Sequence, residues 1–226
     1  TMEEILKGEV DFPYGAERPL KYFDEYMKSG CYPFCKEPEF ETRLRQIINT
    51  TVELDIPKYA KMTIAATKKL KKFMYYISRS VPVTINYSGM ARDLGIDRDD
   101  LPKYLEYLEK AELVSALGMK ANGDAILRKM DKLYLHNPNI AYVLSGGKAD
   151  VGNARETIFF CWTKERFNTL ESPISDFEID GKTFELGGRK KGKKQITDAK
   201  EGYVVKDNIE YVFDNQIPLW MFGFLY

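Results

Sequence analysis

The sequence predicts an α+β fold, with an N-terminal helical part followed by a small α/β part. Apolar residues recur at helical spacing through the first half of the chain. In the second half, apolar and polar residues alternate on both sides of Asp180-Gly181, which is typical of a β-hairpin, and the apolar runs YVV and IPLWMFGFLY follow. The length of 226 residues exceeds that of most single domains, so we expect more than one compact unit.

Composition excludes several classes of protein. The chain is 44% hydrophobic and 30% charged, as in soluble proteins, and no apolar run could span a bilayer, so we expect a cytoplasmic protein without membrane contact. The formal net charge is zero, so only local patches could attract nucleic acid. His136 is the only histidine and the three cysteines lack further ligands nearby, which argues against a zinc site or a Ser-His or Cys-His catalytic pair.

Residues 1–62 are predicted to be a helical segment. Leu20, Phe23 and Met27 share one face of a helix from Pro19 to Ser29. A second helix begins after Pro38, and we expect Pro57 to break or kink it just after Asp55, because proline lacks the backbone donor of a helical turn.

Residues 63–147 predict a winged helix-turn-helix domain. A helix over 64–78 is followed by one over 86–94 that Gly95 closes, and Asp97 is placed to cap a third. Two short helices joined by a tight glycine-containing turn are the helix-turn-helix layout. Residues 114–135, with Asn122-Gly123 at their centre, predict the wing hairpin.

The third helix carries no clear signature of DNA reading. A recognition helix presents several Arg, Lys, Asn or Gln side chains. Acids and bases are mixed here, so we favour a structural or protein-contact role over sequence-specific DNA binding. The exposed positions are Arg98, Asp99, Asp100, Lys103, Glu106, Glu109 and Lys110.

Residues 148–226 predict a small α/β domain that follows a linker at Gly146-Gly147. We expect Asn153 to cap a helix that runs through Phe167, ahead of the hairpin. A short helix over 195–200 and a buried terminal strand in IPLWMFGFLY should complete the domain.

The hairpin places two acids side by side. Pairing outward from Asp180-Gly181 sets Phe177 opposite Phe184 and Asp176 opposite Glu185. Two carboxylates in that relation lie about 5 Å apart and repel unless a metal or a basic side chain lies between them.

A hairpin with Asp on one strand and Glu on the next resembles the active-site ribbon of the PD-(D/E)xK nucleases. That resemblance implies a restriction-endonuclease-like fold in which Asp176 and Glu185 hold Mg²⁺, and Glu156 on the preceding helix adds a ligand. It also implies a catalytic lysine two residues after Glu185, where this chain has Gly187. Arg189, two residues further on, would face the same side of an extended strand, but a guanidinium group does not readily release a proton. Asp176 and Glu185 are candidates for catalysis, although the lysine is missing from its usual position.

The chain as a whole resembles the region, a domain of unknown function, that follows the AAA+ core in predicted bacterial and archaeal ATPases. The likeness rests on the order of YFDEYMKSGCYPF, VELDIP, YLEYLEKAELV, KLYLHNPNIAYVL, GNARETIFF, DFEIDGKTFELGG and IPLWMFGFLY. It implies that an ATPase domain with Walker motifs precedes Thr1 and binds ATP. The chain itself has no GxxxxGK[ST] sequence, and its start predicts a portion of a longer protein.

We therefore expect a non-catalytic C-terminal module that binds DNA or a partner protein for its parent ATPase, with no cofactor of its own. A basic loop would contact nucleic acid through Arg189, Lys190, Lys191, Lys193 and Lys194. One alternative is a Mg²⁺-dependent DNA endonuclease in which Lys190 or Lys191 replaces the missing lysine. The other is a structural or oligomerising module without nucleic-acid contact.

Overall fold

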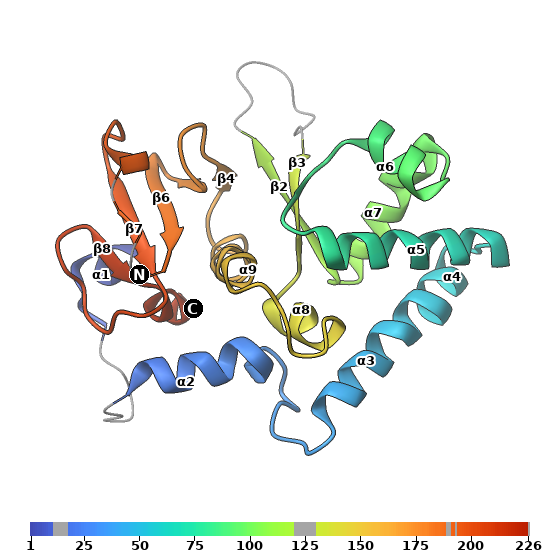
Figure 1. Ribbon diagram of the computed structural model, residues 1–226, viewed down its shortest axis with the longest axis horizontal. Helices are drawn as coiled ribbons and strands as arrows, with labels where there is room; N and C mark the ends of the chain where they lie inside the picture. Colours follow the sequence, from blue (N-terminus) through green and yellow to red (C-terminus); the bar gives the residue numbers. More distant parts are fainter. Residues whose placement is uncertain (11–17, 120–129, 189–190, 193, 226) are drawn as a thin grey trace.

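The computed structural model describes the chain except for residues 11–17, 120–129, 189–190, 193 and 226 (Figure 1). The fold is mixed α/β, as expected at that level. The described strands form one eight-stranded mixed sheet in the order β1-β3-β2-β4-β5-β6-β7-β8. The strands are β1 Val83–Thr84, β2 Val114–Met119, β3 Met130–Leu135, β4 Thr169–Glu171, β5 Phe177–Ile179, β6 Lys182–Gly187, β7 Gly202–Lys206 and β8 Gln216–Pro218.

Helices surround this sheet. The α-helices are α1 Met2–Lys7, α2 Pro19–Glu25, α3 Phe40–Thr50, α4 Ile56–Tyr59, α5 Ile64–Ser80, α6 Tyr87–Leu94, α7 Leu101–Lys110, α8 Pro138–Leu144 and α9 Val151–Thr163. The π-helical and 3-10 turns are η1 Tyr26–Gly30, η2 Thr51–Asp55, η3 Arg98–Asp100, η4 Lys194–Ile196 and η5 Leu219–Phe224. None of the described helices is long and apolar enough to cross a membrane.

The sheet is continuous across the expected linker. Strands β1, β3 and β2 pair antiparallel, and β2 then pairs in parallel with β4 through Gly118 and Leu170. Strands β4, β5 and β6 form an antiparallel meander, and β7 lies parallel to β6. Figure 1 shows α9 between the β2–β3 ladder and the β6–β8 end. The expected linker, Gly146-Gly147, joins α8 to α9, and both glycines have positive φ.

Two hydrophobic clusters lie on either side of this junction. One gathers buried residues of α3 to α8 with β2 and β3, including Leu70, Phe73 and Leu101. The other centres on α9 and includes Met2, Phe23 and the C-terminal run. Helices α1 and α2 thus pack with the C-terminal part of the chain, and α3 and α4 pack with the middle part. The boundaries at 62 and 147 stay predictions.

The hairpin register is confirmed. Phe177 pairs with Phe184, Glu178 with Thr183 and Ile179 with Lys182. Asp180 and Gly181 have φ of 50° and 81°, the left-handed values that a type I′ turn requires. The ladder begins at Phe177, so Asp176 lies just outside it.

Helix α9 differs from its prediction at both ends. Its N-cap is Asp150, whose Oδ1 accepts a hydrogen bond from the Asn153 backbone N–H at 2.8 Å. The Asn153 side chain instead donates to the carbonyl oxygen of Val81. The helix ends at Thr163 rather than Phe167. Asn153 was a wrong cap because a better acceptor stands three residues earlier, which sequence spacing alone does not rank.

Pro57 does not end the helical path, but the regular α-helix gives way to the π-helical turn η2 just before it, where a break or kink was expected. Pro57 lies in the first turn of α4, directly after the π-helical turn η2. Proline is tolerated where a turn has no need of its N–H, and the wider π turn absorbs the missing bond. The path from Phe40 to Tyr59 is therefore continuous in helical turns.

Other predicted elements are shorter or of another type. The terminal run is buried as expected, but only Gln216–Pro218 is a strand, and 3-10 helix η5 follows. Leu219, Trp220, Met221 and Phe222 are all buried, which a strand exposing alternate residues would not achieve. The helix expected over 195–200 is the 3-10 turn η4, and Asp97 makes no side-chain cap. The wing tip at Asn122-Gly123 lies outside the described residues.

Candidate functional site

Three acids predicted as metal ligands come from neighbouring elements. Glu156 lies on α9, Asp176 lies just before β5, and Glu185 lies on β6. Each of the three side chains is at least half-buried, and Glu185 is only 1% exposed. Asp176 reaches β6, because its Oδ2 accepts the backbone N–H of Leu186 at 2.7 Å. The hairpin and α9 thus bring these carboxylates near one another beside β5 and β6, two interior strands of the sheet.

A lysine is paired with the most buried acid. The Nζ atom of Lys191 forms an ion pair with Oε1 of Glu185. The other carboxylate oxygen of Glu185 accepts a hydrogen bond from the hydroxyl of Ser175. The sequence alternatives included Lys190 or Lys191 moving in beside Glu185, and Lys191 lies there.

The absence of a side chain at Gly187 makes room for this lysine. A Cβ atom built on Gly187 would lie 2.3 Å from both Cβ and Cγ of Lys191 and 2.9 Å from its Cδ. Carbon atoms that are not bonded to each other do not approach so closely, so a side chain at position 187 would displace Lys191. Glycine therefore stands where the nucleases have a lysine on the strand, and it leaves the space in which Lys191 of the loop lies.

The carboxylates repel one another. Burial, followed by the charges of Glu156 and Glu185, raises the pKa of Asp176 to about 6, while the Leu186 N–H and Lys191 act in the other direction. Burial also raises the pKa of Glu156, with a contribution from Glu185, although Lys132 and the Tyr134 hydroxyl oppose the shift. The Tyr134 hydroxyl donates to Oε2 of Glu156 at 3.1 Å. A cluster of like charges in a partly buried place is typical of a site that binds a cation.

The rest of the basic loop is partly described. Lys191 is half-buried at the acids and Lys194 is exposed on η4. Arg189, Lys190 and Lys193, also predicted to contact nucleic acid, lie outside the described residues. Beside the loop, Arg155 donates through Nε to Oδ2 of Asp207 at 2.9 Å, which ties α9 to the end of β7.

The acids suit Mg²⁺ only as part of a mixed set. Across the described residues, no three His, Cys, Asp or Glu side chains are grouped closely enough to hold a metal ion by themselves. Mg²⁺ does not require such a cage, because it is commonly held by one or two carboxylates together with water and substrate phosphate. Asp176 and Glu185 would supply those two carboxylates.

The lysines of the helical part are largely engaged within the chain. Lys69 lies 3.7 Å from a carboxylate oxygen of Asp100, and Lys71 forms an ion pair with Glu53. Lys72 donates to the carbonyl oxygen of Leu94. On α7, Lys110 pairs with Glu106 at 2.6 Å. These partners reduce the positive charge that α5 and α7 present to solvent.

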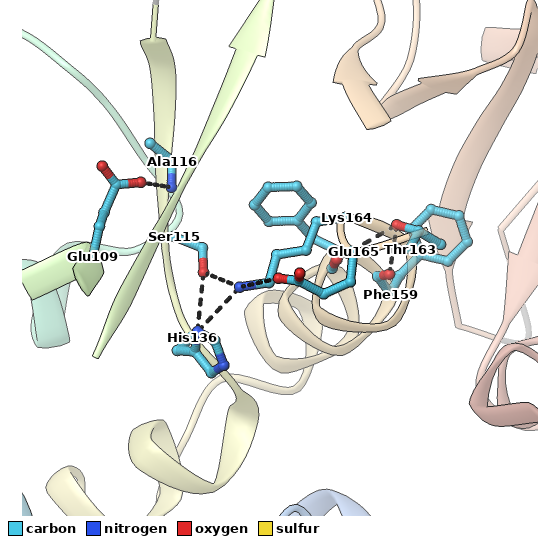
Figure 2. Close-up of polar contacts among 9 residues, drawn as sticks. Glu109, Ser115, Ala116, His136, Phe159, Thr163, Lys164 and Glu165 are labelled. Atoms are coloured by element: carbon cyan, nitrogen blue, oxygen red, sulfur yellow. Dashed lines mark hydrogen bonds and ion pairs between the residues drawn. The ribbon is translucent and has the colours of Figure 1, made fainter. Parts of the chain in front are cut away.

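A second polar cluster lies near the β2–β4 junction, and sequence analysis did not find it. Figure 2 shows Lys164, just after α9, reaching Ser115 on β2 and His136 after β3. Its Nζ lies 2.8 Å from the Ser115 hydroxyl oxygen and 3.1 Å from Nδ1 of His136. The three residues are far apart in the sequence and form no motif, so only the folded sheet brings them together.

Comparison with known families places the chain in one of them. A family model described as "Domain of unknown function (DUF8612)" matches residues 20–150, and the chain belongs to that family. The match covers the helical part and ends just before α9, so the acid cluster lies beyond it. The family description carries no function, and the expected ATPase neighbour stays a prediction.

One curated protein matches a stretch of the chain. The chain is 34% identical over 64 residues to a protein of Sulfolobus acidocaldarius described as "HTH-type transcriptional activator ArnR". That stretch is 26% of this chain, and the chain spans about a quarter (24%) of the length of the relative. No solved structure matches the chain.

The electrostatics of the acid cluster predict that Asp176→Asn stabilises the protein in a pH-dependent way. The pKa of Asp176 is raised from 3.8 to about 6, so its destabilising charge is absent below pH 4, grows between pH 4 and 6, and is fully present above 6. At pH 8 we expect a gain of roughly 1–3 kcal/mol in the free energy of unfolding, and almost none at pH 4. Denaturant unfolding at the two pH values measures the difference.

The exposed Asp198→Asn is the matched control and should change stability at neither pH. A loss of stability at pH 8 in Asp176→Asn would mean that the carboxylate is well satisfied and not held in a repulsive cluster.

Proposed function

We propose that this chain carries a metal-dependent phosphodiesterase site that cleaves DNA, formed by Asp176, Glu185 and Lys191 with Glu156 beside them. The observation that carries the proposal is the Lys191–Glu185 ion pair across Gly187. The expectation of a non-catalytic module rested on the missing lysine at position 187. With an ammonium group beside Glu185, the geometry favours the nuclease alternative.

The arrangement of the C-terminal elements supports a restriction-endonuclease-like domain. Helix α9 is followed by the antiparallel strands β4, β5 and β6, and then by β7 parallel to β6. This order resembles the core of the PD-(D/E)xK nucleases named above, with the acid pair on the central hairpin. Fold alone does not license function, so the proposal rests on the side chains rather than on the topology.

The residues have separate roles in hydrolysis. Asp176 and Glu185 would hold Mg²⁺, and Glu156 lies beside them without completing a three-carboxylate ligand set. Bound Mg²⁺ supplies Lewis-acid stabilisation of the charge that develops on the phosphate. The Lys191 ammonium orients the attacking water and stabilises negative charge near the phosphate. The water oxygen would bond to phosphorus and lose a proton to solvent, while the bond from phosphorus to the sugar oxygen breaks and that oxygen takes up a proton from solvent, so that no net proton is gained or lost in these two transfers.

The basic loop gives the site its substrate preference. Lys191 lies at the acids and Lys194 is exposed a few residues further on, within the GGRKKGKK segment. Lysines attract phosphates through counterion release, whatever the base sequence. The segment would therefore hold a nucleic-acid backbone over the carboxylates.

A second candidate function is DNA binding by the middle part of the chain. The element order α5, β1, α6, α7, β2, β3, with β1 paired to β3, fits a winged helix-turn-helix. The activator from Sulfolobus acidocaldarius is described as an HTH-type protein, which supports this assignment. The paired lysines of α5 and α7 argue for weak binding with little sequence preference. Under this candidate alone, the chain would be the non-catalytic module of a parent ATPase, with ATP bound outside it.

The first prediction is Mg²⁺- or Mn²⁺-dependent relaxation of supercoiled plasmid DNA. Asp176→Ala should abolish it, and Lys191→Gly should lower the rate by roughly 10²-fold or more, because a positioned charged group is lost. Lys182→Met is the matched control and should retain activity. Lys182 lies on β6, the strand that carries Glu185, but its Nζ lies 3.5 Å from a carboxylate oxygen of Glu201. Wild-type protein that binds DNA but never cuts it would leave the non-catalytic module as the function.

The second prediction is a rescue. A lysine at position 187 would stand where the PD-(D/E)xK nucleases have their catalytic lysine. It fits only if residue 191 has no side chain, because a Cβ on residue 187 would lie only 2.3 Å from the Cβ of Lys191. We expect the double variant Gly187→Lys/Lys191→Gly to recover most of the cleavage lost in Lys191→Gly. Gly187→Ala, which displaces Lys191 and supplies no amine, should lose activity. Equal activity in Gly187→Ala and wild type would exclude the role of Lys191.

The third prediction separates the two DNA-binding surfaces. Fluorescence anisotropy with duplex DNA, in Ca²⁺ or without metal, should give an affinity that falls with salt. Reversing Lys190, Lys193 and Lys194 to Glu should weaken binding and reduce the salt slope. Reversing Lys103 and Lys110 on α7 should change it less. The opposite ranking would place the main DNA contact on the helix-turn-helix.

A further inference from the structure

A polar cavity of about 590 Å³ lies at the junction of the middle and C-terminal parts of the chain. Its lining comes from α7 and the turn after it, from β2, from His136, and from the segment between α9 and β4. The volume suits a small molecule. The acid cluster is formed by the N-terminal half of α9 with β5 and β6, whereas this cavity begins where α9 ends, so the two places are distinct.

Lys164 supplies one fixed positive charge within the cavity. Its side chain is 16% exposed, and two of its three N–H donors are used by Ser115 and His136. Burial and the Lys164 charge lower the pKa of His136, so the imidazole is neutral at pH 7 and accepts from the ammonium. Among the described residues, the remaining donor faces Glu165, at 3.6 Å, whose side chain is 77% exposed. Lys164 is therefore held in place with one donor available to an incoming carboxylate (Figure 2).

A second observation points to a ligand at the same place. Thr169 also lines the cavity and is only 8% exposed, yet its Oγ1 is buried without a hydrogen-bond partner among the described residues. An unpaired buried hydroxyl costs free energy, and a polar ligand or water is the usual remedy.

The acidic side chains of the lining favour a ligand that also carries positive charge. Glu109, Glu112 and Glu165 line the cavity against the ammonium of Lys164. Burial raises the pKa of Glu109, while the Ala116 backbone N–H, 2.9 Å from Oε1, opposes the shift. The Lys164 charge also opposes the shift, and a cation bound beside Glu109 would act in the same direction. Phe160 and Phe167 add apolar surface for an aliphatic stem.

We propose that this cavity binds a free cationic amino acid, with its carboxylate at Lys164 and its cationic groups at Glu109, Glu112 and Glu165. The ligand contacts residues that precede β2 and residues that precede β4, the two strands that join the parts of the sheet. Binding therefore stabilises that junction. This site is independent of the phosphodiesterase proposal.

Calorimetric titration of the whole chain with L-arginine tests the proposal, with agmatine as the comparison. Agmatine has the same guanidinium and amine groups but no carboxylate. L-arginine should bind and raise the melting temperature, and agmatine should bind at least about tenfold more weakly, because the contact with Lys164 is missing. This comparison uses the wild-type protein and does not depend on the folding of any variant.

Lys164→Gln should remove the preference for L-arginine over agmatine, and Glu109→Gln should weaken both ligands. Lys28→Gln, an exposed lysine on η1 outside the cavity, is the control and should bind as wild type does. Absence of L-arginine binding at millimolar concentration would overturn the proposal. So would equal affinity for agmatine in the wild type, or an unchanged preference in Lys164→Gln.

Discussion

The packing of α9 on the sheet is the constraint on which both sites depend. Phe159 lies 5.1 Å from Phe177, 5.4 Å from Phe184 and 4.9 Å from Phe222, measured between ring centroids. Offset aromatic contacts of this kind add to a large buried apolar area and fix the rotation of the helix. With that face buried, Glu156 is directed to the acids at one end, and Lys164, just beyond the other end, reaches the β2–β4 junction.

The acid cluster combines burial with unfavourable charge. The hairpin turn, the Leu186 N–H and the Ser175 hydroxyl hold Asp176 and Glu185 in place although their charges repel. Proteins retain such arrangements at sites where a cation or substrate completes the charge balance, and they do so at a cost in stability. Lys191, which lies on a loop, provides part of the balancing positive charge. A side chain on a loop can turn away from Glu185 more readily than a lysine on a strand could, which would make room for a metal ion.

The sequence predicted the parts of the fold that depend on local chemistry. The Asp180-Gly181 turn set the hairpin register, Gly95 closed α6, and the helical spacing of Leu70, Phe73 and Ile77 identified a buried helix face. Contacts between separate segments of the chain could not be predicted in detail. The sequence offered Lys190 or Lys191 as a replacement for the missing lysine, but no periodicity shows which of them approaches Glu185 or that the Lys191 side chain folds back over Gly187. The cavity at Lys164 joins three separate segments, and the parallel β2–β4 pairing that closes it has no local signal.

The account is tested most directly by diffraction from a Mn²⁺-soaked crystal of the chain, with data collected at the manganese absorption edge. We expect an anomalous peak bound by carboxylate oxygens of Asp176 and Glu185, with the Lys191 ammonium turned away from Glu185 and toward the metal-bound solvent. No peak at these acids, with Lys191 still paired to Glu185 at saturating Mn²⁺, would contradict a metal-dependent phosphodiesterase.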